Sequence, residues 1–403
     1  MKMNFPPSQS RSFLPKELIV KVLSLLPVKS MMRMRCLGKS YNSLFIDPIF
    51  VKMHLQQSAR NPHLALVTTK IPSAQNPHLA LITTNIERVI PFPVRNLLEN
   101  PSISLDEDPQ YLIVNNIDNE GSNVHRIVGS CNGLICLLIF TYSLGYRDAW
   151  LQFWNPSTRT RSEKLGYIRL FRNKYYGPIY YEFTFGYDNL TSTYKVVMLG
   201  YHCKNMMILE TKVFSLGDNI WRNITNLPAV PLQVFNFRQH YVVYLKGTLN
   251  WLAVFDFPID SVNKYVIISL DLGTERYTQM RLPQGFDKLP QVFPTIGVLN
   301  GRLSFSYDVK QTHFVLWHMM DFRVVESWTP LLQISYENLQ IDYFGGPIFY
   351  LVPLHLSEDC QTLILASTVE DQAILYNTRN NSVERTRIPN TLMDYVESLV
   401  SIC

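Results

Sequence analysis

Two short motifs recur along this chain at intervals near 50 residues, and this spacing constrains the fold more than any other feature. The first motif spans five residues: glycine at the first position, leucine or isoleucine at the third and an aromatic residue at the fifth. It occurs at 247–251, 301–305 and 346–350, with a weaker relative at 132–136. The second is a recurring proline, at Leu227–Pro228, Leu282–Pro283, Thr329–Pro330 and Ile388–Pro389. Repeats of this length in a β-rich chain are typical of a β-propeller, whose blades are four-stranded antiparallel sheets.

Short β-rich runs separated by turn residues fill the chain from about residue 120 onward and predict an all-β domain over residues 121–403. The runs are Trp150–Trp154, Tyr181–Tyr187, Lys195–Leu199, Lys212–Leu216, Tyr241–Leu245, Tyr265–Leu270, Phe314–His318 and Gln372–Tyr376. We expect a propeller-like domain of about six blades. A β-sandwich whose turns recur at similar intervals is the alternative.

Residues 14–57 have a different pattern, with apolar side chains at helical spacing. The apolar positions of a first predicted helix are Leu18, Ile19, Val22, Leu23 and Leu26, and those of a second are Met34, Leu37, Tyr41, Leu44 and Phe45. Pro27 is expected to stop the first helix, and Asp47 and Pro48 predict the cap and first position of a third. Three short helices bury too little surface to be stable alone, which points to a partner. Residues 1–13 are expected to be disordered.

The charge of this block indicates the kind of partner. It holds seven basic residues and two acidic ones, and the resulting excess equals the net charge of +5 of the whole chain. A basic, apolar helical module predicts an acidic protein partner that offers a hydrophobic groove. The alternative is a helical cap that only covers the larger domain.

The same block resembles the F-box of plant proteins. The matching residues are Leu14–Pro15, Glu17–Ile19, Leu26–Ser30, Arg35–Leu37, Lys39–Ser40 and Asp47–Phe50. The resemblance implies binding to the Skp adaptor and, through it, to a cullin and RING ubiquitin ligase. Two positions depart from the plant pattern: Gly38, where cysteine is common, and Tyr41, where tryptophan is usual. A glycine inside a helix costs about 1 kcal/mol relative to alanine.

Eight residues of the block are the predicted contacts to the Skp adaptor. The apolar ones are Leu14, Pro15, Ile19, Leu23, Leu26, Pro27 and Val28, and Lys39 is the predicted basic contact at the rim. The residues that bind a substrate are not indicated by any pattern.

The β-rich part resembles the F-box-associated domain, a kelch-like propeller that follows many plant F-boxes. The residues that carry the resemblance are Gly129–Leu134, Trp154–Arg159, Phe185–Asp188, Tyr194–Val197, Val213–Leu216, Trp221–Arg222 and Gly247–Leu252. The resemblance implies a domain that recognises substrates.

Residues 58–120 are expected to be a linker that contains the first strand or strands. Asn61–Thr69 recurs as Asn76–Thr84, a tandem duplication of 15 residues. We expect one copy to close the first blade against the C-terminal segment 396–402, and the other to be a redundant strand or loop. A hairpin made by both copies is the alternative. The proline-rich stretch that follows, to about residue 120, is expected to be an irregular exposed connection.

Motifs of catalysis, of cofactor binding and of metal binding are absent from the sequence. The six cysteines are scattered without metal-ligand spacing, and no basic stripe outside the first 57 residues indicates nucleic-acid binding. The longest apolar run, 134–140, is far shorter than the roughly 20 residues of a membrane span. We expect a non-catalytic protein of the cytoplasm or nucleus, without cofactors and without a nucleic-acid or membrane partner.

Two functions from different classes follow. The first is the substrate-recognition subunit of a ubiquitin ligase made of Skp, cullin and F-box proteins, in which propeller loops capture a protein. The second is a propeller that binds a glycan or metabolite independently of the ligase, with exposed aromatics such as Tyr175, Tyr176, Tyr180 and Tyr181 stacking on a sugar. A pollen self-incompatibility F-box protein that recognises a secreted ribonuclease is compatible with the resemblance, although no residue demands it.

Overall fold

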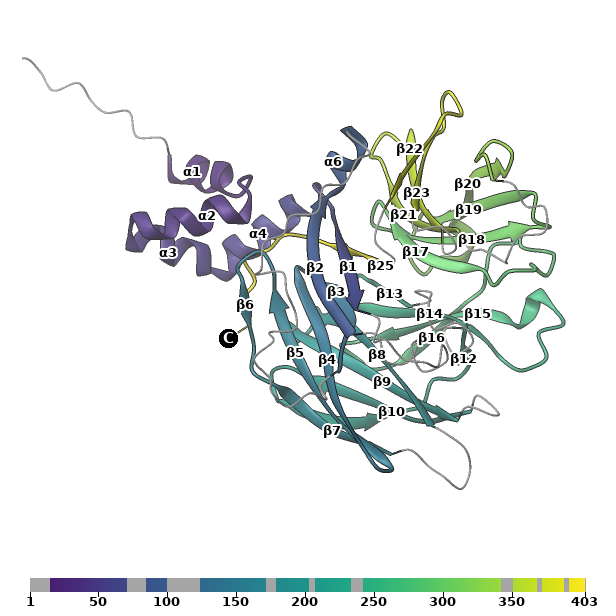
Figure 1. Ribbon diagram of the computed structural model, residues 1–403, viewed down its shortest axis with the longest axis horizontal. Helices are drawn as coiled ribbons and strands as arrows, with labels where there is room; N and C mark the ends of the chain where they lie inside the picture. Colours follow the sequence, from purple (N-terminus) through teal and green to yellow (C-terminus); the bar gives the residue numbers. More distant parts are fainter. Residues whose placement is uncertain are drawn as a thin grey trace, which may run out of the picture.

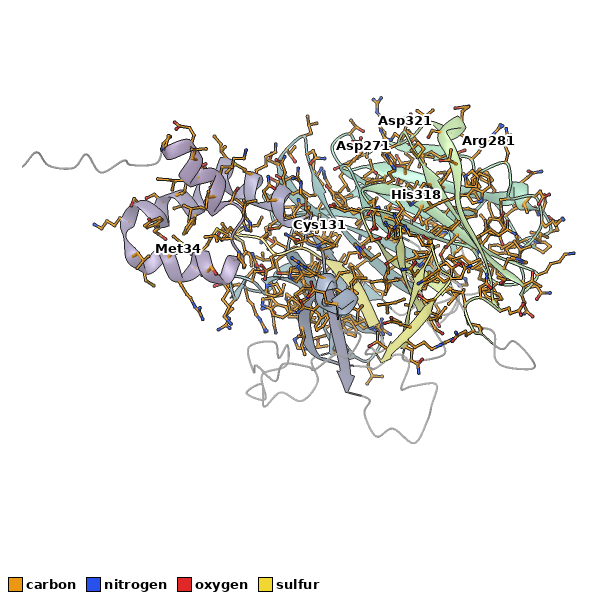
Figure 2. All side chains as sticks on the ribbon, turned by 90° about the horizontal axis from the view of Figure 1, so that it is seen from above. Met34, Cys131, Asp271, Arg281, His318 and Asp321 are labelled. Atoms are coloured by element: carbon orange, nitrogen blue, oxygen red, sulfur yellow. The ribbon has the colours of Figure 1, made fainter. Side chains whose placement is uncertain are left out.

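A computed structural model describes residues 15–70, 85–99, 124–171, 179–202, 207–232, 242–341, 351–367, 372–387 and 391–402. A small helical module leads into a ring of six β-sheets, as expected (Figure 1). The helices of the module are α1 (Lys16–Leu23), α2 (Val28–Met34), the 3-10 turn η1 (Arg35–Leu37), α3 (Lys39–Ile46) and α4 (Pro48–Ser58). Figure 2 shows the module, with Met34 in it, at one end of the molecule.

The second predicted helix is divided into two by Gly38. This residue has an extended backbone, with φ 170° and ψ 159°, and connects η1 to α3. The helix penalty expected for a glycine therefore does not arise. Tyr41 packs its ring 6.1 Å from that of Phe45 inside the module. Both departures from the plant pattern are thus accommodated by the fold of the block.

Prolines and a capping aspartate set the helix starts. Pro15 and Pro27 precede α1 and α2 directly, so Pro27 begins a helix, whereas α1 has already ended at Leu23. The predicted third helix is confirmed as α4. The side chain of Asp47 accepts hydrogen bonds from the backbone N–H of Ile49 (2.7 Å) and Phe50 (3.4 Å), which satisfies two free donors of the first turn.

The six sheets are the blades of a β-propeller. Blade 1 holds β3 (Val124–Cys131), β4 (Leu134–Ser143), β5 (Tyr146–Asn155), β6 (Thr160–Arg161) and β7 (Leu165–Phe171); blade 2 holds β8 (Ile179–Asp188), β9 (Thr193–His202), β10 (Ile208–Ser215) and β11 (Ile220–Ile224). Blade 3 holds β12 (Val230–Pro231), β13 (Val242–Leu245), β14 (Thr248–Val254), β15 (Tyr265–Asp271) and β16 (Tyr277–Met280); blade 4 holds β17 (Thr295–Leu299), β18 (Arg302–Val309), β19 (His313–Met319) and β20 (Trp328–Ser335). Blade 5 holds β21 (Leu351–Leu356), β22 (Thr362–Ser367), β23 (Gln372–Asn377) and β24 (Val383–Arg387).

Blade 6 closes the ring with strands from both ends of the chain. Its order is β2 (Asn85–Pro93), β1 (His63–Lys70) and β25 (Thr391–Tyr395). The first copy of the duplication supplies β1, whereas the second copy lies outside the described residues. The strand that pairs with β1 is β25, which lies directly before the expected segment 396–402. Pro91 and Pro93 belong to β2 and not to an irregular connection. They are tolerated there because β2 is an edge strand, and α6 (Val94–Glu99) follows it.

The glycine motif marks the turn between the first two strands of a blade. Asn132 and Gly133 (φ 49° and 81°) join β3 to β4, and Lys246 and Gly247 (φ 50° and 85°) join β13 to β14. Two consecutive residues with positive φ make the tight hairpin turn for which glycine is favoured. The recurrence at 346 lies outside the described residues. The proline at Pro330 is inside β20, the outer strand of blade 4, and does not follow that strand.

The ring has two faces, which we call proximal and distal. The proximal face carries the turns after the first and third strands of each blade, because successive strands are antiparallel. The segment 396–402, which we call the C-terminal tail, packs on this face. A Cβ on Gly133 would lie 2.3 Å from the Ser398 Oγ atom, and Ser157 forms a 2.6 Å hydrogen bond with Tyr395. The helical module is also connected to the ring on the proximal face, where α4 leads into β1. The distal face carries the turns after the second strands and the loops between blades.

Candidate functional site

Helix α1 is apolar on two sides, and only one of them is covered. Leu23 is buried in the core of the module, where Val20 and Leu26 pack against it. Leu18, Val22 and Leu25 point away from that core and are 49%, 58% and 63% exposed. Leu18 and Val22, four residues apart, lie on one face of α1, and Leu25 follows in the turn after the helix. The module therefore presents an uncovered apolar ridge, which we call the α1 ridge and define by Leu18, Ile19, Val22 and Leu25.

The predicted partner contacts divide into exposed and interior residues. Pro15, Ile19, Pro27 and Lys39 are exposed, and Leu26 is half-buried. Leu23 and Val28 are interior residues of the module, at 6% and 0% exposure, so they shape the surface by packing beneath it. Leu14 lies outside the described residues.

Sequence reasoning missed several exposed apolar side chains of the module, namely Leu18, Val22, Leu25, Leu37, Ile46 and Ile49. It placed Leu18 and Val22 on one apolar side of the first helix together with Ile19, Leu23 and Leu26, but did not name these two among the partner contacts. The detectable signal was that α1 and its following turn carry more apolar positions than one buried stripe of a short helix can use.

The C-terminal tail completes the core of the helical module. Leu399, 7% exposed, packs with Val28, Met31 and other apolar residues of the module. The backbone N–H of Val28 donates a hydrogen bond of 3.4 Å to the Glu397 carboxylate, which also lies 4.0 Å from the His63 Nε2 atom. The tail therefore holds the module against the ring, and the α1 ridge has a defined position relative to the propeller.

Burial lowers the pKa values of the two histidines near the junction between the tail and the helical module. His54 lies 3.1 Å from the Leu26 carbonyl oxygen through its Nε2 atom. Burial lowers the pKa of His54, although the hydrogen bond to the Leu26 carbonyl and the charge of Glu397 oppose the shift. Burial likewise lowers the pKa of His63 against the opposing charge of Glu397. Both side chains are therefore favoured in the neutral form, and the junction holds no buried imidazolium charge at neutral pH.

The distal face carries exposed aromatic side chains. All three exposed phenylalanines among the described residues lie there: Phe171 ends β7 before an inter-blade loop, and Phe255 and Phe257 lie between β14 and β15. Leu144, Met207 and Leu289 are further exposed apolar residues of this face. The proximal face also carries exposed apolar residues, at Leu190, Ile220, Met320 and Val324, so the distal face is distinguished by its exposed phenylalanines, which make it a candidate interaction surface.

The aromatics expected to stack on a sugar are differently placed. Tyr180 and Tyr181 lie in β8 and are half-buried, so their rings are not fully exposed to solvent. The Tyr180 ring packs 5.9 Å from that of Tyr201. Tyr175 and Tyr176 lie outside the described residues. In the described part of the chain, no group of three or more His, Cys, Asp or Glu side chains is arranged to hold a metal ion. None of the helices there is long and apolar enough to span a membrane.

Comparison with known proteins identifies the family. Residues 79–402 match the model of the F-box associated beta propeller domain. The chain belongs to this family. It is also similar to the F-box/kelch-repeat protein At3g23880 of Arabidopsis thaliana, at 28% identity over 91% of this chain and 88% of that protein. F-box protein CPR1 of the same plant is 24% identical over 96% of this chain and 87% of its own length.

The two Arabidopsis matches cover more of the chain than the propeller, at 91% and 96% of its length. An F-box followed by an F-box-associated propeller, as expected from the sequence, is therefore the architecture of this chain. Among solved structures, the β-propeller domain of the Trilobed protease from Pyrococcus furiosus is similar at 10% identity, with a TM-score of 0.35 over 66% of this chain and 71% of that one.

Proposed function

We propose that this protein is the substrate-recognition subunit of a ubiquitin ligase that contains Skp, cullin and RING proteins. The F-box binds the Skp adaptor, and the distal face of the propeller captures a protein substrate. The chain itself performs no chemistry. It raises the local concentration of the substrate near the ubiquitin-conjugating enzyme. Such a ligase works in the cytoplasm or nucleus, where we place this protein.

The uncovered α1 ridge is the observation that carries the proposal. Three large aliphatic side chains of α1 and one of the turn that follows it are exposed to water although the module has a core of its own. The exposed lysines and arginines around them, including Lys21, Lys29, Arg33 and Lys39, favour an acidic partner. A helix that offers spaced apolar anchors to a groove is a common mode of protein recognition.

Co-expression with a plant Skp adaptor, followed by size-exclusion chromatography, tests the first half of the proposal. The wild-type chain is expected to elute in a stoichiometric complex, and a chain without residues 1–57 is expected not to. Replacing Val22 and Leu25 together by aspartate should abolish the complex, because two carboxylates would enter an apolar interface unpaired. Replacing Leu26 and Pro27 together by alanine should also abolish it.

The matched control is Gln56→Asp, which adds a carboxylate at an exposed position of α4 outside the ridge. This variant should retain the complex. Wild-type protein that remains soluble alone and ignores the adaptor would contradict the ligase assignment. Self-association without Skp would instead favour the independent glycan- or metabolite-binding module.

A further inference from the structure

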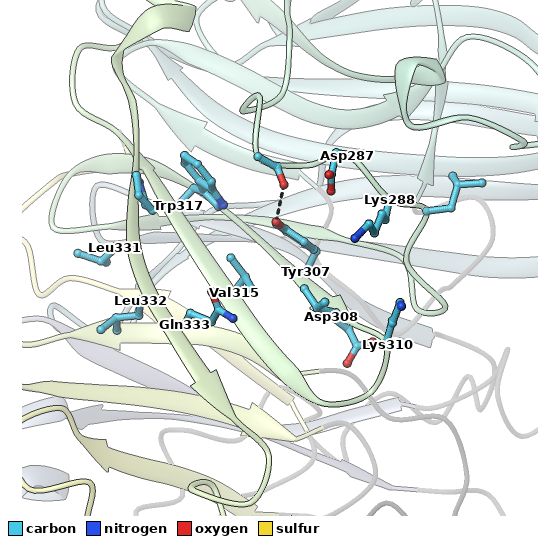
Figure 3. A pocket seen from close by; sticks show the side chains of 14 residues that line it. Asp287, Lys288, Tyr307, Asp308, Lys310, Val315, Trp317, Leu331, Leu332 and Gln333 are labelled. Carbon is cyan, nitrogen blue, oxygen red and sulfur yellow. Dashed lines mark hydrogen bonds between the residues drawn. The ribbon is translucent and has the colours of Figure 1, made fainter.

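A pocket of about 390 Å³ opens at blade 4, within the size range of ligand-binding clefts (Figure 3). It lies where the loop between β16 and β17 meets β18, β19 and β20. Lys310 belongs to the turn after β18, the second strand of the blade, so the pocket opens on the distal face. It therefore faces away from the F-box.

One wall of the pocket is fixed by aromatic packing. Phe286 is buried, and its ring centroid lies 5.5, 5.1 and 4.9 Å from those of Tyr265, Phe305 and Tyr307. The Tyr307 hydroxyl donates a hydrogen bond of 3.0 Å to the carbonyl of Gly285. A Cβ on Gly285 would lie 2.4 Å from the Trp317 ring, so the loop can approach this ring only because position 285 is glycine. Asp287, Lys288 and Leu289 thus project from an anchored loop.

The opposite wall is also fixed. The buried carboxylate of Asp308 accepts a hydrogen bond of 2.8 Å from the backbone N–H of Gln311 and another from the Tyr336 hydroxyl. These bonds hold the turn that carries Lys310 and occupy both oxygens of Asp308. The pocket is therefore preformed, which reduces the entropy lost when a ligand binds.

The pocket has an apolar end and a charged end. Trp317, Leu331 and Leu332 lie at one side, and Lys288 and Lys310 lie at the other (Figure 3). Within the described part of the chain neither lysine belongs to an ion pair that satisfies its charge. Asp287 is the one exposed carboxylate of the lining, since Asp308 is already hydrogen-bonded.

We propose that this pocket binds a short acidic segment of the target protein. An aromatic or large apolar side chain of the segment packs against Trp317 and the two leucines, and flanking carboxylates bind Lys288 and Lys310. Tryptophan is frequent among the residues that contribute most to binding at protein interfaces, and the two cations set the sign of the ligand charge. The inference rests on the proposed function, because it identifies the substrate class of the same receptor.

Fluorescence anisotropy with fluorescein-labelled peptides tests the proposal on the full chain bound to the Skp adaptor. The probe is the pentapeptide Glu-Asp-Trp-Asp-Glu, compared with Lys-Lys-Trp-Lys-Lys and Glu-Asp-Gly-Asp-Glu. The wild type should bind the first at least about tenfold more tightly than either of the others, because only the first has both the ring and the negative charge.

Two variants should shift the affinity in opposite directions. Lys288→Glu combined with Lys310→Glu should weaken binding of the first peptide by at least about tenfold, because like charges repel. Asp287→Asn should strengthen it, because a competing carboxylate is removed. Lys246→Glu is the matched control, since Lys246 is exposed in a turn with the same positive φ of 50° as Lys310 but lies on the proximal face. This variant should bind like the wild type.

The outcomes separate the two proposals. A wild type that elutes with Skp but binds all three peptides equally or binds none, or a Lys288→Glu/Lys310→Glu variant that binds the first peptide as the wild type does, would overturn the pocket assignment and leave the ligase assignment standing. A chain that fails to bind Skp yet discriminates among the peptides would overturn the ligase assignment and leave the pocket assignment standing. Equal melting temperatures of the four proteins show that altered binding is not a folding effect.

Discussion

The side-chain amide of Asn155 donates a hydrogen bond of 3.0 Å to the carbonyl of Ser398, and a second of 2.9 Å to that of Val400. Asn155 is fully buried at the end of β5, and its side-chain oxygen accepts hydrogen bonds from the backbone N–H of Ser157 and Thr158. One side chain thus shapes the β5–β6 turn and binds the tail that supports the F-box.

Asn155→Asp should release the C-terminal tail while leaving the turn intact. The substitution keeps the oxygen that caps the turn, but it removes both donors to the tail and places a carboxylate oxygen near two carbonyls, which costs about 2 kcal/mol or more. Hydrogen exchange should quicken in residues 396–402 and in α1–α4 and remain slow in β4 and β5. Unchanged exchange in the tail would show that Asn155 does not hold it.

Leu399→Ala should destabilise the F-box rather than the propeller. Removing a largely buried leucine from a well-packed core costs about 2–4 kcal/mol, and the core of this small module has few other large side chains to compensate. Limited proteolysis of the adaptor-free chain should cut within residues 15–58 sooner than in the wild type. Leu144→Ala, at a position that is 94% exposed, should change nothing.

Glu182, on the inner strand β8, should make the stability of the ring depend on pH. Burial raises the pKa of Glu182 to about 7, against the opposing effects of the Arg126 charge and the hydrogen bond from Tyr201. The folded state therefore favours the protonated acid. This contribution is complete below the unfolded pKa near 4 and is lost as the pH rises through 7. The melting temperature of Glu182→Gln should therefore rise relative to that of the wild type as the pH increases from 5 to 8. A difference in melting temperature that stays constant with pH would contradict the raised pKa of Glu182.

Asp188→Asn should destabilise the contact between blades 2 and 3. The nearly inaccessible Lys195 ammonium lies 2.8 Å from the Asp188 carboxylate and 3.1 Å from that of Glu275 in the next blade. Loss of one partner leaves a buried cation partly uncompensated, at a cost of about 3 kcal/mol. Chemical denaturation at pH 7 should give a lower midpoint for Asp188→Asn than for the wild type. Asp260→Asn, which breaks an exposed ion pair, should leave the midpoint unchanged.

Lowering the pH should reduce the difference in stability between the wild type and Asp188→Asn. Burial acts to raise the pKa of Asp188, but the hydrogen bonds from Lys195, Thr191 and Leu190 outweigh it and lower the pKa below its usual value. Its contribution to stability is therefore present above about pH 4 and is lost as the pH falls through the lowered pKa. Wild type and Asp188→Asn should converge in stability at low pH.

The sequence predicted the repeating architecture because its markers have local causes. The motif at Gly247 recurs because a two-residue turn with positive φ is needed between the first strands of a blade, and Gly301 meets the same need. Asp47 and Pro48 predicted the start of α4 for an equally local reason. Such features depend on neighbouring residues only, so a single sequence displays them.

Features that depend on distant residues were not predictable. The tail is expected from the sequence to pair as a strand in the closing blade, yet Asn155, Gly133 and the F-box core hold it as an irregular segment. The outer side of α1 could not be told from its inner side, since both carry aliphatic residues. The pocket depends on Gly285 lying beside Trp317, and no spacing in the sequence links these two positions.

The use of Leu399 in the core of the F-box has a consequence for the order of events during synthesis. The F-box leaves the ribosome before the propeller, but the side chain that completes its core is made after the strand that closes the ring. A nascent or prematurely terminated chain therefore carries an unfinished docking module. The core of the F-box is complete only when the ring of the propeller can also be complete.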